Sequence, residues 1–383
     1  MSKFTRGFLI FLVVFIVLYT LATGLLIPAA KNIFLATFPP KDLPKPIYGL
    51  LDPLEFTPKQ PQTPPQSYTI NTRDAKLPES QPKQMVVYKV KPSEQSFEAG
   101  KTARDNAKIL GFSDQNLTSD LKGTSYKWRN IETGGVLDIN INSRILKLLT
   151  PLVGKSSYFS TGSLNQKKAT DTAINLFRSL NRFDDGLYSK GTQKVAFGKY
   201  VGSQIYETVY TQEAQIARVD LFRSINKIPI LGPDAKKGML SAVVRDIPPN
   251  SESTAHMNYP IVDAYYWEVN PESNATYPLI PVSQAWDAVK SNTAVVSNIA
   301  PKGANPFTDY NNIKIDSIII NDIYLAYYDN FQYQKYLQPI YVFEGNYLTS
   351  GTVGGSITYY FPAIEGQYIK QPLNQRPQTQ KPK

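Results

Sequence analysis

The pattern of hydrophobic and polar positions divides the chain into an apolar start, a proline-rich stretch and a long patterned remainder. No residue is charged from Gly7 to Ala30, a run of 24 residues. At about 1.5 Å rise per residue, a helix of this length crosses a hydrocarbon core of roughly 30 Å. A cleavable signal peptide has a shorter apolar core, although Ala22–Gly24 and Ala29–Ala30 leave room for cleavage. We therefore predict a single-pass transmembrane anchor over residues 7–30, with a cytoplasmic tail over residues 1–6.

The orientation of this anchor depends on the basic residues at its two ends. Lys3 and Arg6 precede it, and Lys31, Lys41 and Lys45 follow it, so the positive-inside count is nearly balanced. A short basic tail before an apolar run is the usual arrangement of a signal anchor. We predict a cytoplasmic N-terminus, with the C-terminal body outside the cytoplasmic membrane in a bacterial cell envelope.

Proline dominates the next stretch. Residues 39–82 contain eleven of the 29 prolines. Proline fixes φ and lacks an N–H donor, so this stretch is unsuited to a core helix or a central strand. We predict a semi-extended linker over residues 31–83. The polar end of the chain predicts a disordered tail over residues 366–383.

Between these segments, three stretches repeat apolar residues with a helical period, and strand-like runs follow each of them. The stretches are SFEAGKTARDNAKILGF with Gly111 as C-cap, NQKKATDTAINLFRSLNRF, and SQAWDAVK with Ser283 as N-cap. TSYKWRN and GVLDINI flank ETGG, which predicts a hairpin. The inward-facing helical residues are predicted to be Phe97, Ala99, Ala103, Ala107, Leu110, Ala169, Ala173, Leu176, Phe177, Leu180, Ala285, Trp286 and Val289. We predict an α+β body of two units, residues 84–185 and a larger 186–365, each a short helix on an antiparallel sheet.

The run YLQPIYVFEG at residues 336–345 sets a proline inside an aromatic strand pattern. Alternation places Tyr341 and Phe343 on one face with Pro339, and Ile340 and Val342 on the other with Glu344. A proline within a strand predicts an edge position or a bulge.

Charge and cysteine content exclude several classes of protein. The formal net charge is +10, but residues 1–83 and the tail after Glu365 each carry +4, which leaves +2 for residues 84–365. A nucleic-acid-binding domain gathers its basic residues on one folded face, so we predict no nucleic-acid partner. The absence of cysteine excludes disulfides, cysteine-ligated metals and thiol nucleophiles.

No catalytic motif emerges. His256 is the single histidine and lies in a polar segment predicted to be a surface loop. S-x-x-K occurs at Ser80–Lys83 and Ser224–Lys227 without the further elements that Ser/Lys hydrolases need. The sequence does not place carboxylates such as Asp220, Asp316, Asp322 and Glu344 at the separation that glycosidases require. We predict no enzymatic activity, no cofactor and no metal site.

Several short motifs resemble the PepSY-like α+β modules of membrane-anchored bacterial regulators of the YycH/YycI type. The matching residues are Val219, Phe222, Arg223, Ile225, Ile228, Pro229, Ala285, Val289, Leu325, Tyr327, Tyr328, Tyr336, Leu337, Pro339, Tyr341, Phe343, Glu344 and Gly345. The resemblance covers residues 84–365 and is clearest over 214–361; the long proline-rich stretch departs from it. It implies tandem PepSY/cystatin-like units and a role in inhibition, sensing or scaffolding at the outer face of the membrane.

We thus predict a membrane-anchored, extracytoplasmic regulatory module without catalytic activity that binds a protein partner at the cell envelope. The candidate partner-binding surface is Tyr327, Tyr328, Tyr336, Tyr341, Phe343 and Glu344. The alternative for these aromatics is packing in the core. The alternative functions are binding of a cell-wall glycan through exposed tyrosines, and a Ser/Lys or carboxylate wall hydrolase.

Overall fold

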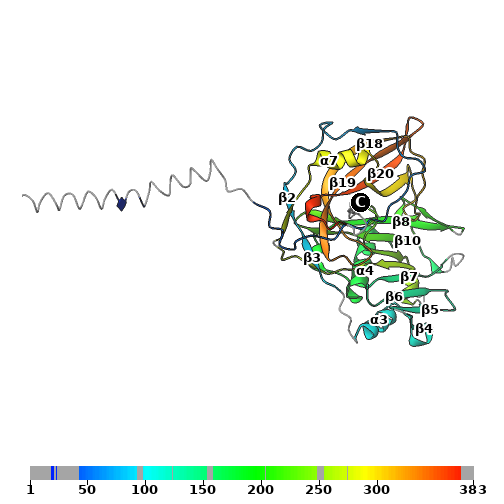
Figure 1. Cartoon of the computed structure of the whole chain (residues 1–383). Helices are drawn as coiled ribbons and strands as arrows, with labels where there is room; N and C mark the ends of the chain where they lie inside the picture. Colours follow the sequence, from blue (N-terminus) through cyan, green and yellow to red (C-terminus); the bar gives the residue numbers. More distant parts are fainter. Residues whose placement is uncertain are drawn as a thin grey trace, which may run out of the picture. The chain divides into compact units, whose positions relative to one another are not determined.

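Two nine-stranded β-sheets form the framework of the body, and Figure 1 shows β18–β20 beside α7, and α3 and α4 beside β4–β7. The computed structural model describes residues 19–20, 23, 43–92, 98–122, 124–152, 158–202, 204–247, 254–273 and 275–371. Residues 45–383 belong to one compact unit, and both sheets lie within it.

The first sheet, called the β19 sheet, is built on three long consecutive strands. In spatial order it contains β11 (Arg223–Ile225), β12 (Ile228–Leu231), β18 (Ser317–Tyr328), β19 (Tyr336–Thr349), β20 (Thr352–Pro362) and β17 (Val295–Pro301). β1 (Ser67–Ile70) pairs in parallel with the start of β18, and β12 pairs in parallel with its end. β3 (Tyr88–Val90) pairs with β19 and with β15 (Val269–Asn270).

The second sheet, called the β10 sheet, is an antiparallel array. In spatial order it contains β4 (Leu117–Lys122), β5 (Ser125–Arg129), β6 (Val136–Asn140), β7 (Leu146–Leu149), β14 (Ile261–Ala264), β13 (Leu240–Arg245), β10 (Ile216–Leu221), β8 (Gln193–Val201) and β9 (Gln204–Glu207). A separate two-stranded sheet joins β2 (Gln84–Val86) to β16 (Thr276–Pro278). The predicted hairpin around ETGG is confirmed as β5–β6.

The three predicted helices are confirmed. Each packs its apolar stripe against one of the two large sheets. α3 (Glu98–Ile109) and α4 (Gln166–Ser179) pack on the β10 sheet, and α7 (Val282–Lys290) packs on the β19 sheet. Gly111 has φ +81°, as its predicted capping role requires. Asn165 caps α4 by accepting a hydrogen bond from the Lys168 N–H at 2.9 Å. The N-cap of α7 is Pro281, so the predicted cap at Ser283 is wrong by two residues. Two short α-helices, α5 (Asp185–Tyr188) and α6 (Ala255–Asn258), also lie in the body, with short 3-10 helices such as η5 (Gly366–Tyr368).

The predicted fold class is wrong in its arrangement of units. The β10 sheet takes β4–β7 from the first predicted unit and β8, β9, β10, β13 and β14 from the second. The junction is the antiparallel pairing of β7 with β14, in which Leu146 faces Ala264 and Leu149 faces Ile261. Because both strands hydrogen-bond along their length, the two halves are one continuous sheet. The body therefore has two large sheets, one antiparallel and one mixed, in place of tandem PepSY-like units.

The proline-rich stretch is part of the fold, so the predicted linker is wrong from residue 43 to residue 83. Leu51 is fully buried and forms a parallel bridge with Ile369, and β1 adds a strand to β18. We call residues 51–70 the strap. Phe56 of the strap lies 4.6 Å from Tyr328 and 6.2 Å from Tyr360 between ring centroids. Proline limits which backbone groups donate hydrogen bonds, but it does not prevent neighbouring side chains from packing.

The strand that contains YLQPIYVFEG is buried on both faces. Tyr341 and Phe343 belong to the core beneath α7, and Ile340 and Val342 belong to a smaller core that Phe56 covers. The predicted alternation of faces is therefore confirmed.

The predicted edge position of this strand is wrong, because β19 lies between β18 and β20. Pro339 is tolerated because the ladder to β20 ends one residue away, at the pair Ile340–Pro362. Gly345 has a steric cause, since a Cβ at this position would lie 2.0 Å from the Ile319 carbonyl oxygen.

Among the described residues, no helix is long and apolar enough to cross a membrane. This finding contradicts the predicted single-pass anchor and the localisation that depended on it. Residues 1–6, residues 7–30 except Tyr19, Thr20 and Thr23, and residues 372–383 of the predicted tail lie outside the described residues.

Candidate functional site

A polar cleft lies between the two large sheets, and we call it the intersheet cleft. It consists of two adjoining cavities of about 330 and 380 Å³. Both are lined by Arg218 and Asp234, and also by Lys237 and Asp309. The walls come from β8 and β10, from the loop between β12 and β13, and from the loop after β17.

A row of mostly charged residues crosses the β10 sheet, and its part from Lys194 to Lys147 lines the cleft. The residues in this row are register partners on successive strands, from β8 to β5: Lys194, Asp220, Ser241, Asp263, Lys147, Asp138 and Lys127. Directly opposed side chains in an antiparallel pair have Cβ atoms roughly 4.5–5.5 Å apart, so opposite charges there attract. The row thus places charges of both signs on the face that α3 and α4 leave uncovered, with opposite charges paired on either side of Ser241.

The period of two along each strand explains why this face is charged while the other is apolar. On β10, Val219 and Leu221 point into the core with the helices, whereas Arg218 and Asp220 point into the cleft. Arg218 Nη2 donates a hydrogen bond to Asp220 Oδ1 at 2.9 Å, and Arg218 Nη1 donates to the Pro306 carbonyl. Both side chains are largely buried. Through its bond to Pro306, Arg218 joins β10 to the loop after β17.

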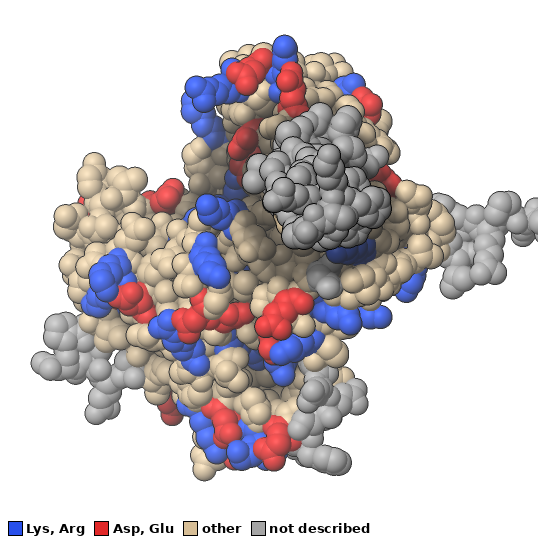
Figure 2. Space-filling view, turned by 90° about the vertical axis from the view of Figure 1, so that its left-hand side faces the viewer, with Lys and Arg blue, Asp and Glu red and all other residues tan. Residues whose placement is uncertain are grey.

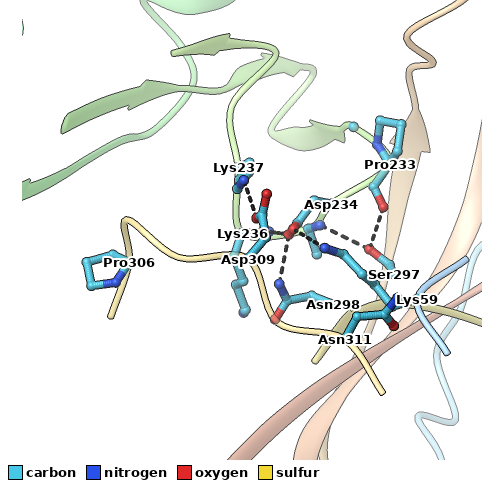
Figure 3. A network of polar contacts seen from close by, with 12 residues as sticks. Lys59, Pro233, Asp234, Lys236, Lys237, Ser297, Asn298, Pro306, Asp309 and Asn311 are labelled. Carbon is cyan, nitrogen blue, oxygen red and sulfur yellow. Dashed lines mark hydrogen bonds and ion pairs between the residues drawn. The ribbon is translucent and has the colours of Figure 1, made fainter. Parts of the chain in front are cut away.

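The loop between β12 and β13 brings a second group of charges against the β19 sheet (Figure 3). Asp234 accepts hydrogen bonds at 2.9 Å from Asn298 Nδ2 and from the Lys236 N–H, and its other oxygen lies 3.8 Å from Lys59 Nζ of the strap. Ser297 Oγ donates to the Pro233 carbonyl at 3.1 Å and accepts from the Ala235 N–H at 3.0 Å. The loop is therefore fixed by β17 and the strap.

Four of the five cations that line the first cavity are paired with acids. Lys59 faces Asp234, Arg218 faces Asp220, Lys237 faces Asp309, and Lys236 Nζ lies 3.0 Å from Glu344 Oε1. No ion pair is found for the fifth, Lys194, within the part of the chain that the structure describes; its ammonium lies 4.8 Å from the centroid of the Phe222 ring. The first cavity thus has one surplus positive charge.

Neighbouring charges and burial shift two pKa values here in opposite senses. The pKa of Lys194 is lowered, because neighbouring protein partly desolvates the ammonium and because Lys236 adds a like charge. For Asp309, burial opposes ionisation, but the hydrogen bond and the charge of Lys237 outweigh burial and hold its pKa below the ordinary value. Lys194 thus remains protonated less readily than an ordinary lysine, while Asp309 is ionised at neutral pH.

The chemistry of the cleft suits binding. Lysine, arginine and carboxylate groups meet apolar walls such as Ile299 and Phe307. Across the described ranges, no group of three or more His, Asp or Glu side chains is placed to hold a metal ion. Figure 2 shows that basic and acidic side chains are intermingled on the face in view, without a large region of one sign.

The aromatic members of the predicted partner-binding surface lie in the core. Tyr327, Tyr328, Tyr336, Tyr341 and Phe343 are all at most 6% exposed. Tyr327 Oη donates to the Val86 carbonyl at 2.9 Å, Tyr328 Oη donates to the Glu55 carbonyl at 3.0 Å, and the Tyr336 ring stacks on Tyr48 at 4.8 Å. These tyrosines therefore hold N-terminal segments against the β19 sheet. Glu344, the sixth predicted residue, is 30% exposed and lies near the cleft through Lys236.

His256 is buried, so its predicted place on a surface loop is wrong. It is 0% exposed, its ring centroid lies 4.8 Å from that of Phe112, and Nε2 lies 3.1 Å from Thr133 Oγ1. Burial lowers the pKa of His256, and hydrogen bonding to the backbone of Leu110 and Gly111 offsets part of that effect.

The structure places the Ser224/Lys227 pair around the end of β11 and distributes the four candidate carboxylates over β10, β18, β19 and the residue before β18. Ser224 is buried in β11, and Lys227 is exposed in the following turn with φ +68°. Asp322 and Glu344 are register partners on β18 and β19. Glu344 accepts a hydrogen bond from Tyr324 Oη at 2.8 Å, whereas Asp220 lies in the floor of the cleft and Asp316 accepts from the Ser350 N–H at 2.6 Å.

Sequence reasoning missed most residues of the cleft. Asp220 entered only as a candidate catalytic acid. The alternation of Arg218 and Asp220 within an apolar strand was the available local signal, because it marks a polar face on a strand whose other face is core. The row across the sheet had no signal, since its members are spread from Lys127 to Asp263 and meet only through strand pairing.

Comparison with known proteins adds little. No family model matches the chain, and the search of curated proteins finds no match. One solved structure of limited similarity is an uncharacterized protein from Eubacterium rectale, with a TM-score of 0.42 and 13% identity over 78% of this chain and 88% of that one. These comparisons lend no support to the resemblance to PepSY-like regulators.

Proposed function

We propose that the body is a non-catalytic binding module that receives an acidic segment of a protein partner in the intersheet cleft. The observation that supports this proposal is the surplus charge of Lys194 at the edge of a cavity whose other four cations are paired. A carboxylate on a partner would give Lys194 the ion-pair partner that the other four cations already have. Apolar walls beside paired charges are typical of protein interfaces, where charges set register and apolar contacts supply affinity.

The identity of the cleft residues favours binding over turnover. An activated nucleophile needs a base within hydrogen-bond reach and a group that orients the base. Four of the five cations that line the first cavity instead form ion pairs with carboxylates. The glycan-binding alternative loses its basis in the named tyrosines, because their rings are buried and their hydroxyls donate to backbone carbonyls.

The proposal is tested with a fluorescein-labelled peptide of ten residues rich in glutamate, and fluorescence anisotropy as the readout. Lys194→Glu should weaken binding about five- to tenfold, which corresponds to about 1–1.4 kcal/mol. Lys199→Glu is the matched control on the same strand, because Lys199 already pairs with Glu213 outside the cleft. Equal loss in both variants, or no binding by the wild-type protein, would contradict the proposal.

The non-catalytic part of the proposal has a separate test. Purified protein is incubated with muropeptides and with p-nitrophenyl acetate, and products are followed by chromatography and absorbance. We expect no turnover above the rate without protein. Turnover that is lost in Asp220→Asn or Lys194→Ala would show that the cleft is an active site.

A further inference from the structure

A second pocket, of about 240 Å³, lies on the opposite side of the β10 sheet from the intersheet cleft. It is bounded by α3, by the residues that follow α4, and by the turn between β6 and β7. We call it the Arg182 pocket. Its polar lining includes Thr102, Asn106, Arg144, Arg182 and Tyr266. The volume is below the range of about 300–1,000 Å³ that is common for drug-sized ligands, so it suits a small group.

The end of α4 fixes Arg182 in this pocket. Asn181 has φ +54°, the left-handed conformation that commonly ends a helix. The Arg182 N–H then donates to the Phe177 carbonyl at 2.8 Å. This is the six-to-one hydrogen bond of a Schellman motif. The side chain is only 5% exposed. Its position is therefore set by local backbone hydrogen bonding.

The guanidinium of Arg182 is poorly compensated. Nη1 donates to the Arg144 carbonyl, but Nε has no hydrogen-bond partner, and within the described ranges no acid forms an ion pair with it. Glu98 also lines the pocket. Burial and the nearby Arg144 lower the pKa of Arg182 to about 10, so the group is still charged at neutral pH.

An unpaired buried cation is unfavourable, and the same protein shows the usual solution elsewhere. Arg223, 2% exposed, forms an ion pair with Asp329, and its Nη1 donates to the Trp267 carbonyl at 2.7 Å. Taking a charge out of water has an effective penalty of several kcal/mol unless a partner offsets it. Arg182 lacks an internal carboxylate in the position that Asp329 occupies beside Arg223.

We propose that the Arg182 pocket binds a small oxyanion, the carboxylate or phosphate group of a ligand, with Arg182 as its principal charge partner. The planar guanidinium offers donors in the geometry that both groups accept. Arg144 adds a second cation, and the buried Asn106 amide adds a polar group with no side-chain hydrogen bond of its own among the described contacts. This site is separate from the intersheet cleft and goes beyond the function proposed for it.

The test uses the full chain and measures heat release and thermal unfolding with inorganic phosphate, sodium acetate and sodium chloride at matched ionic strength. Phosphate or acetate should bind and raise Tm by about 1–3 °C at tenfold excess over Kd, whereas chloride should not. Phosphate alone binding would assign a phosphate-bearing ligand, and acetate alone a carboxylate-bearing one. Absence of binding by both would overturn the proposal.

Two variants separate a ligand site from a structural arginine. Arg182→Met should lose the anion-dependent rise in Tm and have a Tm in chloride at least equal to that of the wild type, because it removes a buried charge that has no acidic partner in the described part of the chain. Arg104→Met is the matched control, since Arg104 lies on α3 over the Tyr126 ring and does not line the pocket. An anion response that persists in Arg182→Met would overturn the proposal.

If Arg182→Met does not fold, Asn106→Asp provides the decisive measurement. It places a carboxylate in the pocket with almost no change in volume, so it should raise Tm in chloride and weaken phosphate binding at least tenfold. Unchanged phosphate affinity in this variant would also overturn the proposal.

Discussion

The two large sheets contain the same number of strands, but they differ in what covers the face that lies away from their helices. The β19 sheet is buried on both faces, by α7 on one side and, on the other, in part by Leu54 and Phe56 of the strap. The β10 sheet is covered by α3 and α4 on one face and carries the charged row on the other. The aromatic residues of the β19 sheet are buried and cannot contact a partner. The charged face of the β10 sheet lines the intersheet cleft and remains accessible. Whether a strand's side chains are accessible to a partner therefore depends on what covers each face of its sheet. It depends less on which residues the strand contains.

The largest effect is expected at the buried ion pair of the β19 sheet. Asp329→Ala leaves the Arg223 guanidinium buried without its partner, and we expect the free energy of unfolding to fall by about 3–5 kcal/mol in urea denaturation. Arg178→Ala is the control, because it breaks an exposed pair with Asp185 and should cost less than about 1 kcal/mol. Equal losses in the two variants would contradict the distinction between the buried and exposed pairs.

The next effect concerns the strap as the second cover of the β19 sheet. Phe56→Ala removes a ring that packs on Tyr328 and Tyr360, and we expect a loss of about 1.5–3 kcal/mol in the same denaturation assay. Val209→Ala, at a side chain that is 82% exposed, should change stability by less than about 0.5 kcal/mol. If Phe56→Ala were as neutral as its control, the strap would be a tether with no part in the core.

A smaller effect of opposite sign is expected within the charged row. Burial raises the pKa of Asp263 more than Lys147 and the other nearby cations lower it, so the folded protein favours the protonated carboxyl. A raised folded pKa means that ionised Asp263 is destabilising at neutral pH, and Asp263→Asn should increase stability at pH 7 by less than about 1 kcal/mol.

The control for this prediction lies in the same row. Asp138 is 39% exposed and its carboxylate lies 3.6 Å from Lys127 Nζ, so Asp138→Asn should reduce stability slightly. A loss of stability in Asp263→Asn would contradict the prediction. It would show that attraction to Lys147 and the other nearby cations stabilises ionised Asp263 by more than burial destabilises it.

The smallest effect is a pH dependence from His256, which lies against Phe112 on the helix-covered side of the β10 sheet. Because burial lowers its folded pKa, the unfolded chain takes up a proton first as the pH falls. Its contribution to stability is complete above about pH 6.5, the unfolded value, and is lost as the pH falls through the folded pKa. Tm measured between pH 8 and pH 5 should decline less in His256→Gln than in the wild type. Identical profiles would contradict the prediction.

Local features of the fold were predictable from the sequence, and pairing between distant segments was not. The stripe Ala169, Ala173 and Phe177 specifies α4 because a helix places these residues on one face without help from the rest of the chain. The pairing of β7 with β14 joins residues more than a hundred positions apart, and alternating strands of similar composition could have paired differently.

The sites depend even more on tertiary structure. Tyrosines such as Tyr328 fit either a core or an interface, and only the position of the strap decides between them. Nothing in the sequence indicated the Arg182 site. The site is defined by a buried guanidinium without an ion-pair partner among the described residues, and only the folded structure shows this.

The bonds between the strap and β18 also constrain the order of events during synthesis. Ser67 pairs with Ser317, and Leu51 meets Ile369 across 318 positions. At about 5–20 residues per second, the ribosome needs about 10–50 s to produce the partner of β1 after β1 itself emerges. During this interval Phe56 and its neighbours have no sheet to cover. Completion of the fold therefore waits for the last strands, and a nascent chain that stalls before β18 exposes an unpaired strand and an apolar segment to aggregation.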